Sequence, residues 1–352
     1  MNNITYKNVH NLFKLDGIHL NREDLCTVAY SFIKEGREFE KAVGDFILDW
    51  FNDKLYIDMN TSGSTGIPKM IRVEKQAMLN SALATGDYFD LKPGNTVLHC
   101  LPTNYVAGKM MFVRAFILGL DMKFVAPSSH PLENIDENFD FCAMVPLQAK
   151  SSIKELKLRK VKKLIIGGGK VQKALELELV KLPIEIYETY GMTETITHIA
   201  AKKIGVEAFT VLPNVKVYLD DRQCLVIDAK NISDDIIVTN DIVDLISDTE
   251  FVWIGRFDNI INSGGIKLMP EQIEEKLSTL IPRRYFVYGE PDGNLGEKLV
   301  LYVEGEPIAI DESIFNVLDK YEKPKEIVFI PKFKETATGK IIRNESRELI
   351  AK

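Results

Sequence analysis

The sequence predicts an α/β protein. A large N-terminal domain combines a mostly parallel sheet with a β-rich subdomain, and a small C-terminal α+β domain follows. Three observations support this class. Short apolar segments alternate with helical patterns through the first half of the chain, helical patterns stop after Thr197, and a compact group of one helix and three strands closes the sequence. Strand–helix alternation is typical of crossover units and therefore of a parallel sheet.

Two amphipathic helices are expected first, within residues 21–50. Apolar residues recur there at helical spacing, and Asn21 precedes them as a suitable N-cap. These apolar positions are Leu25, Val28, Ala29, Phe32 and Ile33, then Phe39, Val43, Phe46, Ile47 and Trp50. Parallel strands are expected at Thr96–Leu101, Met122–Ala126, Phe141–Val145, Lys163–Gly167 and Ile184–Glu188, with helices after Gly108 and after Gly169.

The pattern changes after Thr197. Four β-rich runs predict an antiparallel subdomain: Val215–Leu219, Cys224–Asp228, Ile236–Thr239 and Phe251–Ile254. A boundary near Gly255–Asp258 would divide the chain into residues 1–257 and a mobile domain of residues 258–352. In the second part, Pro270 opens a helix with Ile273, Leu277, Leu280 and Ile281 on one face. Strands are expected at Tyr285–Tyr288, Lys298–Val303 and Glu326–Ile330.

Composition narrows the class of protein. The chain has 352 residues, 27% of them charged, and a formal charge of −7 without a basic stripe, so a nucleic-acid partner is not expected. No apolar run is long enough to span a bilayer and no secretory signal opens the chain, which predicts a cytoplasmic protein. Four scattered cysteines fit reduced thiols: Cys26, Cys100, Cys142 and Cys224. The sequence gives no indication of oligomeric state.

A segment rich in glycine and hydroxyl side chains is the sharpest local signal. It reads Thr61-Ser62-Gly63-Ser64-Thr65-Gly66-Ile67-Pro68-Lys69. Two glycines let backbone N–H groups approach an anion, while hydroxyls and a lysine supply further donors for phosphate oxygens. The usual phosphate-loop pattern Gly-x-x-x-x-Gly-Lys-Ser/Thr is absent. Gly-Ser-Thr-Gly alone would fit an ordinary turn equally well.

Together with four later segments, this one resembles the motifs of the adenylate-forming superfamily, which contains acyl-CoA synthetases, luciferases and peptide-synthetase adenylation domains. The later segments are Tyr190-Gly191-Met192-Thr193-Glu194, Thr239-Asn240-Asp241, Gly255-Arg256-Phe257-Asp258 running into Ser263-Gly264-Gly265-Ile266-Lys267, and Thr338-Gly339-Lys340-Ile341-Ile342-Arg343. The resemblance spans residues 61–343. It implies a ligase that uses ATP and Mg²⁺ to activate a carboxylate as an acyl-AMP and then transfers the acyl group to the thiol of coenzyme A.

The resemblance also implies a role for each motif. Residues 61–69, Gly168 and Gly169, Tyr190 and Gly191, and Asp241 and Arg256 would bind the nucleotide, with Asp241 on the ribose hydroxyls. Thr193 and Glu194 would hold phosphates and magnesium, a hard ion that prefers oxygen ligands. Lys340 would stabilise the charge that develops at the α-phosphate. Asp258 would be a hinge, and Gly264 and Gly265 would line the path of the thiol.

Taken singly, several of these residues have ordinary explanations. Tyr190 alone would suit a core position, Glu194 a solvated surface and Asp241 a turn. Asn240 stands where the family usually has glycine. Because asparagine tolerates left-handed geometry, we expect a turn at Thr239–Asp241 to be kept.

The acid is predicted from the short segment before Thr61 and from the expected acyl pocket. The short form resembles o-succinylbenzoate–CoA ligases of menaquinone biosynthesis, as do the stretches 101–109 and 190–198. Tyr105 stands where many relatives carry a histidine. Lys109 and Arg114 would meet the second carboxylate of the acid, with His198 nearby; an exposed helix face is the alternative. Two other functions remain open, a ligase that loads another acid onto coenzyme A or a carrier-protein thiol, and an inactive nucleotide-binding regulator.

Overall fold

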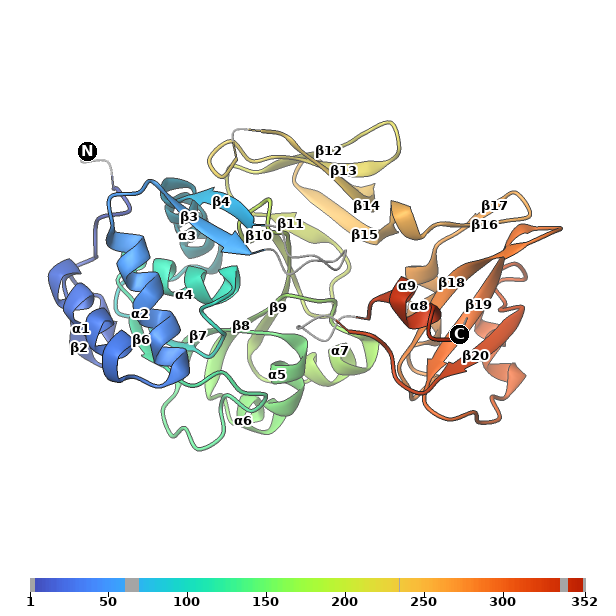
Figure 1. The fold of residues 1–352 in the computed structure, drawn as a ribbon, viewed down its shortest axis with the longest axis horizontal. Helices are drawn as coiled ribbons and strands as arrows, with labels where there is room; N and C mark the ends of the chain where they lie inside the picture. Colours follow the sequence, from blue (N-terminus) through green and yellow to red (C-terminus); the bar gives the residue numbers. More distant parts are fainter. Residues whose placement is uncertain (1–3, 61–69, 234, 336–340, 351–352) are drawn as a thin grey trace.

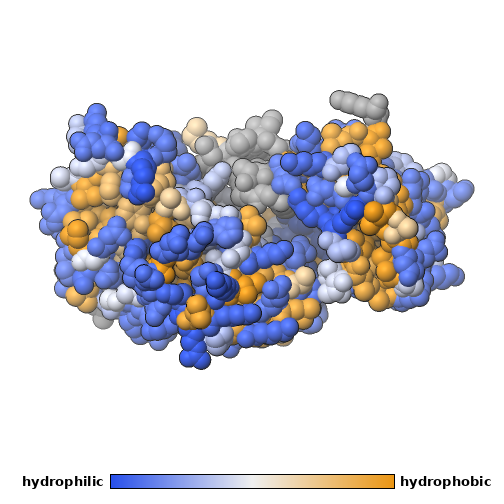
Figure 2. Space-filling model, turned by 90° about the horizontal axis from the view of Figure 1, so that it is seen from below, coloured by the Kyte–Doolittle hydropathy of each residue, from blue (hydrophilic) through white to orange (hydrophobic). Residues whose placement is uncertain are grey.

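The computed structural model describes residues 4–60, 70–233, 235–335 and 341–350 (Figure 1). The predicted phosphate segment Thr61–Lys69 and Lys340 lie outside the described residues. Within the described ranges, no helix is long and apolar enough to cross a membrane. Figure 2 shows hydrophilic residues over most of one face, with apolar residues in separate patches between them.

One sheet of 13 strands forms the large part of the protein, in the order β12-β13-β14-β15-β11-β10-β9-β8-β7-β5-β6-β1-β2. Its parallel half comprises β1 (Lys14–Leu15), β5 (Thr96–His99), β6 (Asp121–Phe124), β7 (Phe139–Met144), β8 (Val161–Ile166) and β9 (Glu185–Gly191), and β2 (Ile18–His19) pairs with β1 at the edge. The antiparallel half comprises β10 (His198–Lys203), β11 (Phe209–Val211), β12 (Lys216–Leu219), β13 (Cys224–Asp228), β14 (Ile237–Leu245) and β15 (Glu250–Arg256). The predicted strands are confirmed. The β-rich run continues the parallel sheet, because β9 and β10 pair antiparallel.

Helices cover both faces of the parallel half. The first face packs against α1 (Arg22–Glu35), α2 (Glu38–Phe51), α3 (Lys75–Phe89) and α4 (Val106–Leu118). The second packs against α5 (Pro146–Ser151), α6 (Ile153–Lys157) and α7 (Lys173–Leu179). Neighbouring residues such as Val97 and Leu98 belong to different cores. Strand side chains alternate between faces, so strands covered on both faces, such as β5 and β7, are largely buried along their length.

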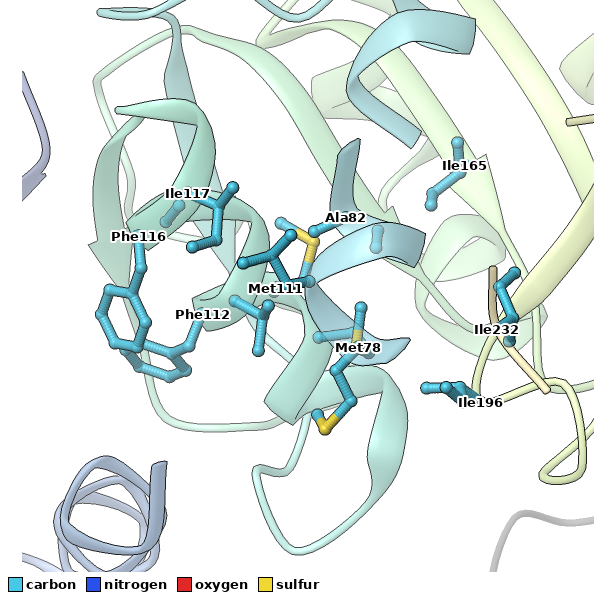
Figure 3. Packing of buried hydrophobic residues seen from close by; sticks show 14 of the residues in the cluster. Met78, Ala82, Met111, Phe112, Phe116, Ile117, Ile165, Ile196 and Ile232 are labelled. Atoms are coloured by element: carbon cyan, nitrogen blue, oxygen red, sulfur yellow. The ribbon is translucent and has the colours of Figure 1, made fainter. Parts of the chain in front are cut away.

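The core on the first face is built largely by α3 and α4. Figure 3 shows Met78 and Ala82 from α3 beside Met111 from α4, with Ile196 bordering the same cluster. A separate antiparallel pair, β3 (Tyr56–Asn60) and β4 (Met70–Glu74), comes before α3 in the chain, and β4 leads directly into that helix.

The small domain has its own sheet and core. It contains β16 (Ile261–Ser263), β17 (Ile266–Leu268), α8 (Pro270–Leu277), β18 (Tyr285–Asp292), β19 (Gly296–Glu304), the 3₁₀ turn η2 (Glu312–Val317), β20 (Glu326–Ile330) and α9 (Arg343–Arg347). The chain enters it through η1 (Phe257–Asn259). The helix predicted through Ile281 is too long: it ends at Leu277 and leaves Leu280 exposed. Pro282 disfavours the α conformation at Ile281, so a regular helix could not include that residue.

The two N-terminal helices pack closely because of one glycine. Asn21 caps α1 as predicted, and its side chain accepts the N–H groups of Glu23 and Asp24. In α2, a Cβ atom added at Gly44 would lie 2.5 Å from the carbonyl oxygen of Ala29 in α1. The backbones of α1 and α2 therefore approach more closely at this point than any side chain would permit.

We expect Gly44→Ala to separate α1 from α2 and to lower the free energy of unfolding by about 1–3 kcal/mol, as overpacking of a tight contact does. Denaturant titration would measure the change. Asp45→Ala, at the exposed neighbouring position, is the matched control and should stay within about 0.5 kcal/mol of the parent. Equal effects of the two substitutions would contradict the close approach at Gly44.

Candidate active site

A buried carboxylate joins the two halves of the sheet. The hydroxyl of Tyr190, near the end of β9, donates to Asp241 Oδ2 in β14 at 2.6 Å. Trp253 Nε1 donates to Oδ1 at 3.1 Å, and Arg256 Nη1 lies 3.8 Å from the same oxygen. Asp241 is only 6% exposed, so these partners offset the cost of burying its charge. Burial and the adjacent Asp241 raise the pKa of Tyr190 well above its ordinary value, which keeps the phenol protonated.

Asp241 reaches this position through an irregularity in β14. Between the pairs Cys224↔Ile242 and Val226↔Val238, β14 advances two residues more than β13. The turn predicted at Thr239–Asp241 is therefore wrong, because these residues form a bulge within a strand that stays paired on both sides. Thr239 Oγ1 accepts the N–H of Asp241 at 3.0 Å and donates to the carbonyl of Leu225 at 2.8 Å. The bulge is thus fixed by its own threonine.

Tyr190 and Gly191 complete β9, and the turn predicted around them begins only at Met192. A Cβ atom at Gly191 would lie 2.3 Å from the carbonyl oxygen of Thr197. Only glycine therefore allows the backbone at Thr197 to approach position 191 this closely. The buried Thr195 hydroxyl accepts the N–H of Met192, and its single hydrogen lies within hydrogen-bond reach of the carbonyls of Thr197, at 2.7 Å, and Met192, at 2.9 Å. Thr193 is half-buried and Glu194 is exposed on the outside of this pinned turn.

Backbone strain accompanies the same turn. Ile196 adopts a φ of 65° although its side chain is 3% exposed. A β-branched residue in the left-handed region is strained, and such strain gathers at functional sites. Nothing in the local sequence signals this conformation, which depends on the packing of Ile196 into the main core.

The glycine turn at residues 167–169 follows β8 and lies at the strand ends next to β9. Gly168 has a φ of 80°. The loop beyond it is held by Glu188, whose carboxylate accepts the N–H of Val171 at 2.9 Å and lies 3.3 Å from Lys202 Nζ. The sequence does not reveal Glu188, because its partners lie on a different loop and a different strand.

Arg114 is a buried cation without a carboxylate partner among the described residues. It is 2% exposed, and its Nη2 donates to Thr197 Oγ1 at 3.2 Å. Its Nη1 lies 3.6 Å from the sulfur of Met111. Its Nε has no hydrogen-bond partner in the part of the chain that the structure describes. Burial lowers the pKa of Arg114 to about 9, so the guanidinium remains charged at neutral pH.

His198 lies beside this cation. Its Nδ1 is 3.3 Å from Thr197 Oγ1, and its Nε2 is 3.3 Å from Thr85 Oγ1 in α3. Burial, reinforced by the charge of Arg114, holds the pKa of His198 well below its ordinary value. The ring is therefore a neutral member of a buried chain of polar groups that runs from α4 to α3.

The structure does not bring Lys109 to Arg114. Lys109 Nζ donates to the carbonyl of Thr103 at 2.9 Å and lies 5.3 Å from the ring of Phe46 in α2. Residues five apart on a helix differ by about 140° in direction, so the predicted basic pair is split between two sides of α4. Tyr105 is the N-cap residue of α4 and is 38% exposed.

The expected hinge and thiol path lie on the small-domain side. Asp258 is in η1, and Gly264 and Gly265 form the two-residue turn between β16 and β17, with φ values of 60° and 82°. Figure 1 shows this hairpin extending away from β9 and β14. The structure therefore groups Tyr190 and Asp241 with Arg256 but leaves the two glycines apart from them.

Across the described ranges, no three His, Cys, Asp or Glu side chains come together as metal ligands. Magnesium needs no such group when phosphates share its coordination, and the exposed Glu194 supplies a carboxylate at the turn.

The family described as AMP-binding enzyme matches residues 34–231, more than half of the chain. The chain belongs to the AMP-binding enzyme family. The resemblance seen in the motifs is thereby confirmed. One solved family member, an acyl-CoA synthetase (AMP-forming)/AMP-acid ligase II-like protein from Dyadobacter fermentans, is 34% identical with a TM-score of 0.61, over 92% of this chain and 98% of that one.

Two further similarities are more distant in sequence. The o-succinylbenzoate coenzyme A synthetase of Bacillus subtilis, solved with ATP and magnesium, shares the fold with a TM-score of 0.72 at 19% identity, over 82% of this chain and 69% of that one. The 2-succinylbenzoate–CoA ligase of Lactococcus lactis is 22% identical over 330 residues, which cover 84% of this chain and 72% of that protein.

We expect Asp241→Asn to weaken ATP binding about ten- to a hundredfold, because hydrogen bonds to a charged group contribute about 1.5–3 kcal/mol. Calorimetric titration with ATP would measure the affinity. Asp244→Asn, an exposed position on the same strand, removes the same charge without touching the Tyr190 cluster and serves as the control. Similar affinities for the two variants would refute a ribose-binding role for Asp241.

Proposed function

We propose that this protein is an ATP-dependent carboxylate–CoA ligase that acts through an acyl-AMP intermediate, and that its acid is o-succinylbenzoate. Family membership supports the adenylate-forming chemistry. The names of the Lactococcus and Bacillus proteins support the acid. The structural observation that supports this choice of acid is the buried guanidinium of Arg114. It has no anionic partner among the described residues.

Adenylation would use the residues grouped at the end of β9. Tyr190 offers a ring for the adenine, Asp241 accepts hydrogen bonds from the ribose, and Glu194 would help to hold magnesium, which neutralises phosphate charge. A carboxylate oxygen of the acid attacks the α-phosphorus of ATP, and the bond to the leaving pyrophosphate breaks. Lys340 would stabilise the charge that develops on the phosphate oxygens.

Thioester formation is the second half-reaction. The thiolate sulfur of coenzyme A attacks the acyl carbon, and the bond between that carbon and the AMP oxygen breaks. The turn at Gly264 and Gly265 would need to approach the nucleotide for this step. We therefore propose that residues 258–352 rotate as a unit about Asp258 between the two half-reactions.

Arg114 explains why a second carboxylate would be required. An unpaired charge is costly to bury, whereas a bidentate guanidinium–carboxylate pair is strong and directional. o-Succinylbenzoate carries one carboxylate to react and one to bind. Thr197 and the neutral His198 would supply the other polar groups beside the bound carboxylate.

The direct test is a screen for AMP release with coenzyme A present. o-Succinylbenzoate should be turned over well, while benzoate, acetate and long-chain fatty acids should not. A monocarboxylate used as efficiently as o-succinylbenzoate would overturn the substrate but not the ligase chemistry. If a thioester formed only on a carrier protein, that protein and not coenzyme A would be the acyl acceptor. ATP binding without acid-dependent pyrophosphate exchange would indicate a regulator.

Lys340→Ala should slow acyl-AMP formation about 100- to 1,000-fold, the usual loss for one preorganised electrostatic contact. ATP affinity should change little, because the lysine acts on charge that develops only during reaction. ATP–pyrophosphate exchange measures the first effect. Exchange within about threefold of the parent would mean that another residue supplies the cation.

Arg114→Met should raise the KM for o-succinylbenzoate about ten- to a hundredfold and leave the KM for ATP within about twofold. Methionine preserves the buried volume, so the loss should report on charge. Lys109→Met is the matched control: it removes a cation from the opposite side of α4 and should change neither KM. Equal effects of the two substitutions would rule out Arg114 as the selective carboxylate site.

A further inference from the structure

The side chain of Asn240 connects the large sheet to the segment that leads into the small domain. Its Oδ1 accepts a hydrogen bond from Arg222 Nη1 at 2.9 Å, and its Nδ2 donates to Asp258 Oδ2 at 3.1 Å. Asn240 lies on the β14 bulge, while Arg222 lies in the turn between β12 and β13. The three side chains form a row from the edge of the sheet to η1.

The chemistry of the two neighbours allows one orientation of the amide. A guanidinium can only donate hydrogen bonds, and a carboxylate can only accept them. The amide oxygen must therefore face Arg222 and the amide nitrogen must face Asp258. Glycine at position 240 could make neither contact, and aspartate could keep the bond to Arg222 but would repel Asp258.

Arg222 is itself held in place. Its Nε donates to Asp220 Oδ2 at 2.8 Å, and its Nη2 donates to the carbonyl of Thr239 at 3.0 Å. Its guanidinium carbon lies 5.3 Å from the centre of the Phe257 ring. The row therefore contacts two successive residues of η1: Arg222 contacts Phe257, and Asn240 contacts Asp258.

Two of the other contacts at η1 and between the domains are exposed ion pairs, and in addition Asn259 of η1 donates to the buried Glu271 of α8. Arg256 Nη2 lies 3.3 Å from Asp258 Oδ2, and Lys170 pairs with Glu275 of α8. Exposed ion pairs contribute little individually. The two hydrogen bonds of the Asn240 amide are exposed as well, but the amide is half-buried and bonds to a charged group on each side, which makes each hydrogen bond stronger than a neutral one.

We propose that Asn240, braced by Arg222, is a latch on Asp258 that holds the small domain in the orientation described here. This inference deepens the proposed function, since it names a residue that controls the step between the half-reactions. In the latched orientation the β16–β17 hairpin points away from β9 and β14 (Figure 1). A change of backbone conformation at Asp258 would move its carboxylate away from the amide, so the latch must open before the glycine turn can approach the nucleotide.

The test measures domain orientation directly. Nitroxide labels at K154C on α6 and K320C in the small domain, in a C26S background that removes the one cysteine not buried, report the distance between the domains by pulsed electron resonance. The unsubstituted protein should show one dominant distance. N240G and N240D should each reduce the ratio of that population to the others about three- to tenfold, as expected for the loss of a charge-assisted hydrogen bond.

The N240D/D258N double substitution exchanges the amide and the carboxylate, so the bond between the two positions is restored while that to Arg222 is kept. It should recover most of the dominant population. N231D, an exposed turn residue of the same subdomain, controls for added charge and should match the parent. An unchanged distribution in N240G and N240D, a double variant no closer to the parent than N240D, or an N231D effect as large as that of N240D would each overturn the latch. The measurement uses no substrate, so its failure and the failure of the ligase proposal are separable.

Discussion

The buried carboxylate of Asp241 is the constraint on which the site depends. A charge this far from solvent is tolerated only with partners, and the partners of this carboxylate come from β9 and β15. The requirement fixes the register of the bulge, the direction of the Tyr190 ring and the placement of Trp253. Phe209 and Phe251 hold the other side of that ring, with centroids 5.9 and 5.2 Å away. Polar and apolar contacts thus impose the same geometry.

Arg114 presents the opposite case, because its charge is buried without a carboxylate in the described part of the chain. Its hydroxyl partner, Thr197, belongs to the turn whose inner face is pinned by Thr195. The cluster around Arg114 and the cluster around Tyr190 therefore share one six-residue turn, and Ile196 carries the backbone strain of that turn. A change at either end would be felt at the other through this short stretch of backbone.

The sequence predicted the strands, the N-terminal helices and the family because these depend on local periodicity and on short contiguous motifs. It failed where the outcome depended on partners distant along the chain. Periodicity gave no sign that β14 would carry two extra residues opposite β13, so Thr239–Asp241 was expected to turn. Lys109 and Arg114 are close in sequence, yet their side chains contact different neighbouring elements of the structure. Glu188 belongs to no sequence motif, and its role is apparent only from its contacts with Val171 and Lys202.

The continuity of the large sheet has a consequence for how an intermediate would be retained. The residues around Asp241 and those around Arg114 are connected through hydrogen-bonded strands and the core they cover, all before η1. The proposed rotation of the small domain about η1 would change none of those contacts. An activated acid held by these residues would stay fixed in one frame while one set of small-domain groups left and another arrived. Hydrolytic loss between the half-reactions would then be limited by how long the site stays uncovered, and not by how firmly the intermediate is gripped.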